Sequence, residues 1–232
     1  MKHAVLLSLL LSPAVLPAAA STKAGDNELT DQEKKDGWVL LFNGKDSDGW
    51  VDGNGGALKP EMIQDGSIDP HGAAGHMVYT KEKYGNFTLV CDFKISAKCN
   101  SGVFIRTGNM KDPVQTGFEV QVFDSSGKEK PGKHDSGALY DIVAPSKNTM
   151  KPAGEWNHFE ITANGGKVTI ALNGEKIVEC DLDQGTEPEK SPDGTKNKFK
   201  KALKDFPREG HVGLQDHGQE CWFKNLKVKP LK

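Results

Sequence analysis

Planar, hydrogen-bonding side chains alternate with apolar ones in three segments that are typical of β-strands. Alternate residues of a strand share a face, so each segment would turn its apolar set to a core and its polar set away from it. The polar sets contain Arg106 in segment 101–107, Glu119 and Gln121 in segment 118–123, and Gln215 and His217 in segment 211–217. If the three strands are neighbours, these side chains gather in one place, and their directional donors and acceptors suit sugar hydroxyl groups. An ordinary solvated sheet face is the alternative, because alternation alone does not make strands neighbours.

Carboxylates near this polar set could carry acid and base catalysis. Glu119 and Asp124 form a pair of the kind that flanks a glycosidic bond during hydrolysis. Asp124 ends its segment, so capping of a turn is an equal interpretation of that residue. The sequence has no E-x-D-x-x-E run of the kind found in β-jelly-roll glucanases, and no G-x-S-x-G elbow that would present a nucleophilic serine.

Two oxygen-rich segments, 46–52 (DSDGWVD) and 135–137 (DSG), could supply ligands to a divalent cation such as Ca²⁺. Neither has the spacing of a complete calcium loop. The sequence contains no Cys-x-x-Cys pair and no Cys/His cluster, which argues against a zinc site. A requirement for a metal therefore stays open.

The elements that must position these residues are short strands joined by glycine-rich turns. Alternating runs lie at 87–95, 101–107, 118–123, 156–163, 167–172, 175–179, 211–215 and 221–229. Asn173-Gly174 joins two of them, and Asn-Gly is a strong hairpin signal because both turn residues need a positive φ. At least eight strands without a long helix predict an all-β domain of two packed antiparallel sheets, a sandwich or jelly roll.

The N-terminal segment has the layout of a secretory signal peptide. Residues 1–20 combine a positive Lys2, an apolar run and the small residues Ala18, Ala19 and Ala20 before the expected cleavage point. A secreted or periplasmic protein without membrane attachment is therefore expected, since no apolar run approaches the ~20 residues needed to span a bilayer.

The rest of the chain is predicted to form one domain. Residues 21–36 are polar and are interpreted as a flexible lead-in, and residues 37–232 form the domain, with a charged insertion at 183–209. Within the insertion, the sequence allows two interpretations, a short amphipathic helix and a solvated surface loop. The helix would present Phe199, Leu203 and Phe206 on one side.

Composition excludes one class of partner and raises the question of disulfides. Thirty Lys and Arg against thirty-two Asp and Glu give a formal net charge of -2, so the basic excess of a nucleic-acid-binding protein is absent. In an oxidising compartment the four cysteines allow three complete pairings, and the sequence does not choose among them. They are Cys91, Cys99, Cys180 and Cys221.

Several blocks resemble, in the same order along the chain, the 3-keto-disaccharide hydrolase domain family. The opening block, 38–50 (WVLLFNGKDSDGW), is similar to the family's LFNGKD signature followed by Gly-Trp. The other matching blocks are 100–106 (NSGVFIR), 117–124 (GFEVQVFD), 136–140 (SGALY), 152–157 (PAGEWN), 172–174 (LNG), 213–218 (GLQDHG) and 223–226 (FKNL). The resemblance covers residues 37–231 and implies a concanavalin A-like lectin/glucanase fold. The glycine-rich stretch after Trp50 and the 183–209 insertion could reshape the rim of the site, which leaves the choice of substrate open.

The resemblance implies an exported hydrolase that cleaves the glycosidic bond of disaccharides oxidised to a ketone at C3. A base could remove the acidified C2 proton, the enediolate could expel the aglycone from C1, and water could then add. Direct hydrolysis by two carboxylates stays open. The expected catalytic residues are Glu119, His217 as its partner, and Asp124 as a second acid or a metal ligand. The expected substrate-binding residues are Arg106, which would stabilise a negative oxygen, together with Gln121, Gln215, Tyr140 and Asn100.

Two other classes of protein fit the same pattern. One is a non-catalytic, lectin-like carbohydrate-binding module, because a fold does not determine chemistry. The other is a structural surface protein that uses the sheet for contacts.

Overall fold

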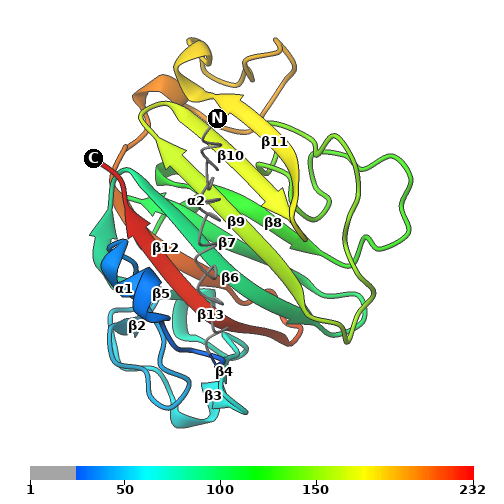
Figure 1. Ribbon diagram of the computed structural model, residues 1–232. Coiled ribbons are helices and arrows are strands. Elements are labelled where there is room, and N and C mark those ends of the chain that lie inside the picture. The colour runs from blue at the N-terminus through cyan, green and yellow to red at the C-terminus, as the bar shows by residue number, and fades with distance from the viewer. Residues whose placement is uncertain (1–24) are drawn as a thin grey trace, which may run out of the picture.

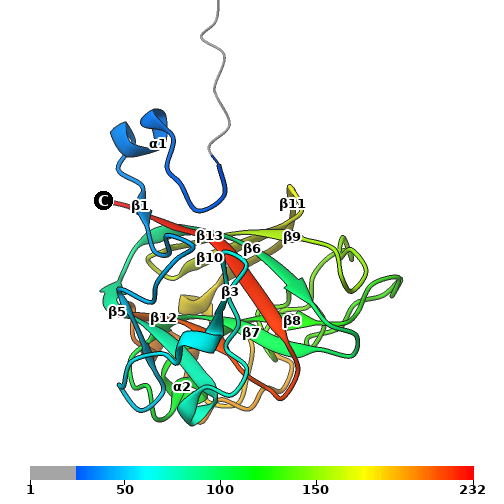
Figure 2. The same cartoon turned by 90° about the horizontal axis from the view of Figure 1, so that it is seen from below.

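The computed structural model describes residues 25–232, which form two antiparallel β-sheets packed face to face (Figures 1 and 2). The signal peptide predicted over residues 1–20 lies outside the described residues. Within residues 25–232, no helix has the length and apolar character needed to cross a membrane.

Sheet A has eight strands in the order β11-β10-β9-β6-β13-β4-β3, with β1 paired to β13. Its strands are β1 (Val39–Leu40), β3 (Ile63–Gln64), β4 (Ser67–Ile68), β6 (Phe87–Ile95), β9 (Asn157–Asn164), β10 (Lys167–Leu172), β11 (Glu175–Asp181) and β13 (Cys221–Pro230).

Sheet B has five strands in the order β2-β5-β12-β7-β8. Its strands are β2 (Trp50–Asp52), β5 (Met77–Tyr84), β7 (Asn100–Thr107), β8 (Phe118–Phe123) and β12 (Gly210–Gln215). The helical elements are short: α1 (Asp31–Lys35), α2 (Pro113–Thr116) and the 3₁₀ turns η1 (Pro60–Met62), η2 (Ala74–His76), η3 (Leu182–Gln184) and η4 (Leu203–Asp205).

The core lies between the sheets and is built from the alternating apolar residues. Every second residue of β6, from Phe87 to Ile95, is fully buried, and the Phe93 ring stacks on Phe159 of β9 with centroids 4.6 Å apart. Sheet B contributes Val103 and Val120 to the same core from its inner face. The prediction of an all-β, two-sheet sandwich is therefore confirmed, and each of the eight predicted strands is present.

Four short strands and β5 have no counterpart among the predicted strands. Strands β1 to β4 contain only two or three residues each, too few for a period of two to be recognised. In β5 the first four residues are buried and the next three are exposed. Its burial therefore lacks the alternation from one residue to the next by which the other strands were predicted.

The segment before β1 is attached to sheet A. Asn27 is buried, its backbone N–H donates to Asn225 Oδ1 (2.6 Å), and the Asn225 N–H donates to Asn27 Oδ1 (2.9 Å). At the start of α1, Thr30 and Glu33 form a capping box. The sequence predicts a flexible lead-in over 21–36. Over the described part of that segment, residues 25–36, the structure instead shows side-chain-to-backbone hydrogen bonds to sheet A that a polar composition does not reveal.

The charged insertion 183–209 folds over one end of the core without forming a continuous helix. Phe199, Leu203 and Phe206 are nevertheless buried, and the Phe206 and Phe118 ring centroids are 5.0 Å apart. The segment is therefore neither the amphipathic helix nor the solvated loop that the sequence allows. Its apolar side chains pack on sheet B, which places Lys198, the residue before Phe199, beside Glu119 on that sheet.

Candidate active site

The outer face of sheet B brings together three of the predicted polar residues. Glu119 pairs with Phe104, and Gln121 pairs with Gly102, between β8 and β7. On the other side of β7, Leu214 pairs with Val103, so Gln215 continues the ladder beside Gly102. Ser101 Oγ donates to the Gln215 carbonyl oxygen (2.7 Å), which is consistent with this register.

Gly102 thus lies between Gln121 and Gln215, and because it has no Cβ the Glu119 carboxyl group extends over it. With neighbouring strands ~4.8 Å apart, the two glutamines are separated by about 10 Å across the glycine. The two amides and the Glu119 carboxyl group therefore share one part of this face. The strand register places Glu119, Gln121 and Gln215 on one face, as the sequence predicts.

Glu119 is the buried acid of this face. Its residue is only 8% exposed. In the amide orientation that satisfies both groups, Gln121 Nε2 donates to Glu119 Oε1 (2.8 Å) and to the Ser101 carbonyl oxygen (3.1 Å). The other end of that amide lies 3.0 Å from the Asn100 side chain. Asn100, Gln121 and Glu119 therefore form a continuous polar row.

The surroundings of Glu119 make it suitable for proton transfer near neutral pH. Burial raises the pKa of Glu119 to about 7, while the positive charge of Lys198 opposes the rise. A carboxyl group with a pKa near the working pH can both give and take a proton, which is what general acid–base catalysis requires.

A second group of residues lies against Glu119. Lys198 Nζ lies 4.0 Å from the centroid of the Tyr140 ring, and Glu119, Tyr140 and Lys198 line one small cavity. Loss of water around the ammonium group lowers the pKa of Lys198, and attraction by Glu119 and Asp141 works in the opposite direction. Burial raises the pKa of Tyr140, and the charges of Glu119 and Asp141 raise it further. Tyr140 is thus a hydrogen-bond donor beside a cation.

Two hollows open beside this row. One has a volume of about 330 Å³ and is lined by Asn100, Gln121, Tyr140 and His134, among others. The other, of about 460 Å³, is lined by His76, Gln215, Asp216, His217 and Gly218. Each is within the range of small-molecule sites. His217 is exposed and belongs to the hollow of Gln215, and within residues 25–232 no hydrogen bond joins it to Glu119.

Asp124 is placed differently from the catalytic role predicted for it. Its Oδ2 accepts the backbone N–H of Lys98 (2.8 Å), so the carboxylate caps the turn between β6 and β7. It lies five residues beyond Glu119 along the chain, which is ~16 Å of extended strand. The capping interpretation is therefore the one the structure supports, and Asp124 is not paired with Glu119.

Arg106 is also placed away from the outer face of sheet B, contrary to the prediction. A β-bulge interrupts the pairing of β7 with β12 between His211 and Gly213, and Arg106 has a φ of 54°. The bulge turns the side chain inward, as an extra residue in a strand does. There the guanidinium donates to the carbonyl oxygens of Gly85 (2.8 Å) and Gly165 (2.8 Å) and to Asn86 Oδ1 (3.2 Å). Arg106 thus joins sheet B to the β9–β10 turn of sheet A.

Replacement of Arg106 is expected to affect stability first. In Arg106→Leu the buried guanidinium group is lost and its three partly buried acceptors lose their donor, which should lower the free energy of unfolding by about 3 kcal/mol in urea titrations. The control is Lys147→Met, which removes an exposed ion pair with Glu175 and should change stability by less than ~1 kcal/mol. Equal stabilities of Arg106→Leu and wild type would contradict this role.

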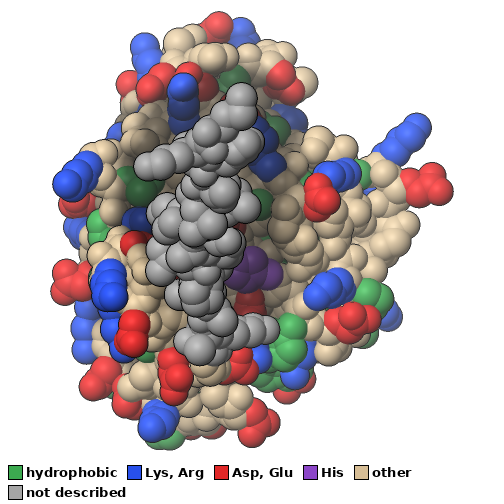
Figure 3. Space-filling model, viewed as in Figure 1, with side chains coloured by type: hydrophobic (Ala, Val, Ile, Leu, Met, Phe, Trp, Pro, Cys, Tyr) green, Lys and Arg blue, Asp and Glu red, His purple; other side chains and the backbone are tan. Residues whose placement is uncertain are grey.

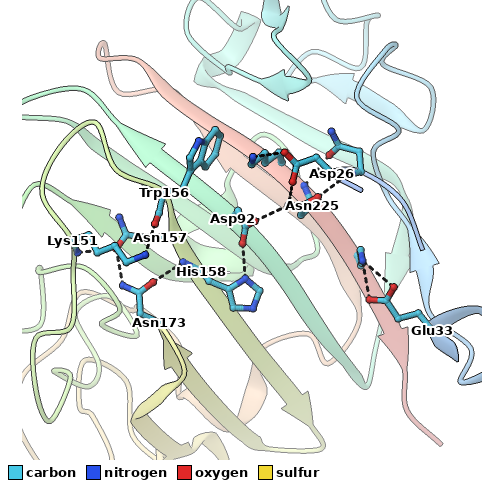
Figure 4. Close-up of polar contacts among 12 residues, drawn as sticks. Asp26, Glu33, Asp92, Lys151, Trp156, Asn157, His158, Asn173 and Asn225 are labelled. Carbon is cyan, nitrogen blue, oxygen red and sulfur yellow. Dashed lines mark hydrogen bonds and ion pairs between the residues drawn. The ribbon is translucent and has the colours of Figure 1, made fainter. Parts of the chain in front are cut away.

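The outer face of sheet A carries another polar cluster, shown in Figure 4. His158 Nδ1 lies 2.6 Å from Asp92 Oδ1, and Asn225 Nδ2 donates to Asp92 Oδ2 (2.7 Å). Burial pushes the pKa of Asp92 upward, but these hydrogen bonds outweigh it and the pKa is lowered. Asp92 is therefore a stable carboxylate that holds neighbouring segments together, in contrast to Glu119. Basic and acidic side chains are interspersed over the visible part of this face (Figure 3).

Three tryptophans, whose flat rings could stack on a sugar, lie away from the outer face of sheet B. Trp50 is buried, and its Nε1 donates to the Leu41 carbonyl oxygen (2.7 Å). On sheet A, Lys94 Nζ lies 5.2 Å from the Trp156 ring and 4.7 Å from the Trp222 ring. None of these three lines the two hollows on sheet B.

The oxygen-rich segments form internal hydrogen bonds. Asp135 Oδ2 accepts the Gly132 N–H (2.5 Å) and Lys128 Nζ (2.6 Å), and Asp46 accepts the Asn43 amide (2.9 Å). Across the described part of the chain, no three His, Cys, Asp or Glu side chains are grouped as metal ligands. A divalent cation stays a prediction.

Sequence reasoning missed Lys198 and Gly102. A Cβ on Gly102 would lie 2.4 Å from Glu119 Oε1, so the glycine makes room for the carboxylate. A glycine inside a strand is a signal of such a close approach. Lys198 has no comparable signal, because it lies in a segment without periodicity.

Comparisons with known proteins now bear on this site. The family model of the 3-keto-alpha-glucoside-1,2-lyase-like domain matches residues 37–229. The chain belongs to this family. The match confirms the resemblance found in the sequence blocks, and the lyase-like domain includes Glu119, Gln121, Tyr140 and Gln215.

Individual relatives agree with the family assignment. A Bacteroides thetaiotaomicron protein named 3-keto-disaccharide hydrolase is 30% identical over 230 residues, covering 84% of this chain and 79% of that protein. Two Parabacteroides distasonis crystal structures, provisionally classed as glycosyl hydrolases, are similar to this chain. The first is 34% identical with a TM-score of 0.75 and covers 90% of this chain and 100% of its own. The second is 31% identical with a TM-score of 0.72 and covers 84% and 99%.

Proposed function

We propose that this chain cleaves the glycosidic bond of 3-keto-disaccharides, with Glu119 moving the proton. The observation that carries the proposal is the buried Glu119 carboxyl group, with a pKa raised to about 7, held by Gln121, which itself lines a hollow of about 330 Å³. The family membership and the name of the Bacteroides thetaiotaomicron relative support the same class of substrate.

The family is named as a lyase and the Bacteroides thetaiotaomicron relative as a hydrolase. Both names describe the same overall reaction if it runs in two stages. A 1,2-lyase removes the C2 proton and breaks the bond from C1 to the aglycone oxygen. Addition of water across the resulting C1=C2 bond, with hydroxide at C1 and a proton at C2, then gives the product of hydrolysis. We propose elimination followed by hydration, because it needs one proton-transfer group rather than two carboxylates on opposite sides of the bond.

The roles follow from the positions on sheet B. The Glu119 carboxylate takes the C2 proton, and the electron pair left at C2 is delocalised onto the ketone oxygen at C3. When this pair forms the C1=C2 bond and the C1–O bond breaks, protonated Glu119 gives its proton to the aglycone oxygen, which leaves as an alcohol. Lys198 and Tyr140 supply a positive charge and an O–H donor beside that carboxylate, so they replace Arg106 as the group that stabilises negative oxygen. Gln121, Asn100 and Gln215 bind hydroxyl groups.

The proposal is tested by incubating the purified protein with 3-keto-trehalose and 3-keto-lactose, each beside its unoxidised parent. Released monosaccharide is measured with and without a chelator, which also tests the metal prediction. Release from the keto sugars is expected. Binding of these sugars without release would favour the lectin-like alternative, and neither binding nor release would overturn the carbohydrate assignment.

The pH dependence of cleavage should respond to Lys198. Cleavage that needs ionised Glu119 rises with pH through the pKa of that group. Lys198 lowers this pKa, so Lys198→Met should raise it and move the rising limb of the pH–rate profile to higher pH. The profile of kcat/KM reports this shift. A rising limb that stays in place, or moves to lower pH, would show that Lys198 does not act on the base.

We also propose export, on the signal-peptide pattern of residues 1–20. The N-terminus of the protein recovered from the cell envelope or medium should begin near Ser21. Recovery from the cytoplasm with Met1 in place would contradict export.

A further inference from the structure

Two of the four cysteines lie side by side at one end of the core. Cys221 begins β13 and pairs with Ile95 at the end of β6. Cys99 lies in the turn that follows β6, where its N–H donates to the Ser96 carbonyl oxygen (3.2 Å), and the Ser96 N–H donates to the Glu220 carbonyl oxygen (3.1 Å). The turn and the start of β13 are thus adjacent pieces of backbone.

Their thiol groups meet between the sheets. Cys99 and Cys221 are both fully buried in the same core cluster, and the nearby Cys99 side chain contributes to raising the pKa of Cys221. All four cysteines lie within the described residues and are free thiols in this structure. The pair is therefore positioned for a bond that joins the start of β7 in sheet B to the start of β13 in sheet A.

The other two cysteines have no partner within reach. Cys91 is on β6 and Cys180 on β11, and strands β9 and β10 separate them. Three strand spacings amount to ~14 Å, whereas a disulfide needs Cα atoms within about 7 Å. Cys91 is also four residues along β6 from Ile95, or ~13 Å from the Cys221 row. Cys180 on β11 is four strand spacings from Cys221 on β13. Among the described cysteines, Cys99 and Cys221 are therefore the pair that the fold brings together.

We propose that Cys99 and Cys221 form a disulfide bond in the exported protein. The two thiols lose two protons and two electrons as the S–S bond forms, and a disulfide oxidant of the compartment is reduced to a dithiol. Burial raises the pKa of Cys221 well above its usual value, and neither sulfur is exposed. Thiol–disulfide exchange requires an ionised thiol that the oxidant can reach. The bond therefore forms during folding, before the two thiols are buried.

The bond would also steady one side of the candidate active site. The loop from Gln215 to Cys221 carries His217, and the segment after Cys99 holds it: the Asn100 N–H donates to Gln219 Oε1 (3.3 Å). Since the bridge closes a loop spanning more than half of the chain, it restricts the unfolded state strongly.

The test maps the cysteines of the full chain recovered from an oxidising secretory compartment. The protein is unfolded in an alkylating reagent without reductant, its intact mass is measured by mass spectrometry, and it is then digested. We expect the mass of the reduced chain with two alkyl adducts, lowered by two hydrogen atoms, together with a linked Cys99–Cys221 peptide pair and alkylation of Cys91 and Cys180 only. A second arm refolds the reduced protein in reduced and oxidised glutathione, so that a failure of export does not affect the outcome. Alkylation of Cys99 and Cys221 in both arms, or a different linked pair, overturns the proposal.

Matched variants separate the bond from the loss of a buried thiol. Reduction should lower the thermal midpoint of wild type and of Cys91→Ser by about 5–10 °C, and should leave that of Cys99→Ser unchanged. An equal response of all three proteins would contradict a stabilising bond. Cleavage of a keto sugar is not needed in any arm, so the result is independent of the chemistry proposed for Glu119.

Discussion

Glu119→Gln should abolish cleavage of 3-keto-disaccharides while leaving their binding intact. Glutamine keeps the size of the side chain and its contact with Gln121 but cannot accept a proton. Loss of a general base typically costs ~10²–10⁴-fold in rate, and kcat should fall by this amount. Binding of the keto sugar, measured by calorimetry, should change only a few-fold. Full turnover in this variant would show that another group removes the proton.

The stability of the same variant supplies a control that needs no substrate. The pKa of Glu119 is raised in the folded protein from 4.5 to about 7, so the unfolded chain ionises more readily. Wild type should therefore lose stability as pH rises from about 4.5 to 7, by ~3 kcal/mol if the whole shift is realised. Glu119→Gln should lack this loss. Parallel stability curves for the two proteins would mean that Glu119 is not held in a desolvated site.

Gly102→Ala should reduce cleavage almost as severely, although residue 102 has no side chain to contribute. The new methyl group would lie 2.4 Å from Glu119 Oε1 and 2.9 Å from its carboxyl carbon, so the carboxylate must move. A displacement of ~1 Å in a catalytic group can cost about 10²-fold in rate. The measurement is kcat/KM with 3-keto-trehalose, alongside thermal unfolding to show that the variant is folded.

Gly85→Ala is the matched control for that substitution. A Cβ at Gly85 would meet its nearest neighbour at 3.6 Å, an ordinary contact, and the residue lies away from Glu119. This variant should keep wild-type activity. If Gly102→Ala is also fully active, the room beside Glu119 is not needed for cleavage.

Alternation was sufficient to predict where Glu119 and Gln121 lie. Strand β8 is regular and pairs with β7 without interruption, so a period of two maps directly onto the two faces of sheet B. The same argument failed at Arg106, because one extra residue in β7 reverses the alternation beyond it. A bulge depends on the partner strand, and a single strand's sequence does not contain that information.

Other parts of the site depend on contacts between distant segments. Lys198 reaches Glu119 because Phe199 and Phe206 are buried against Phe118, which is a tertiary effect in a segment rich in charge. The attachment of Asn27 to Asn225 is of the same kind. Strand patterns therefore predicted the two layers and the polar face, and the covering segments required the structure.

The most direct test of the account is cleavage of 3-keto-trehalose in heavy water. If a base on the protein removes the C2 proton before the bond to the aglycone breaks, the released 3-keto-glucose should carry deuterium at C2, beyond what free 3-keto-glucose takes up in the same time without the protein. Wild type should give this label, and Glu119→Gln should give neither label nor release. Released sugar that retains its original hydrogen at C2 would contradict proton removal by Glu119.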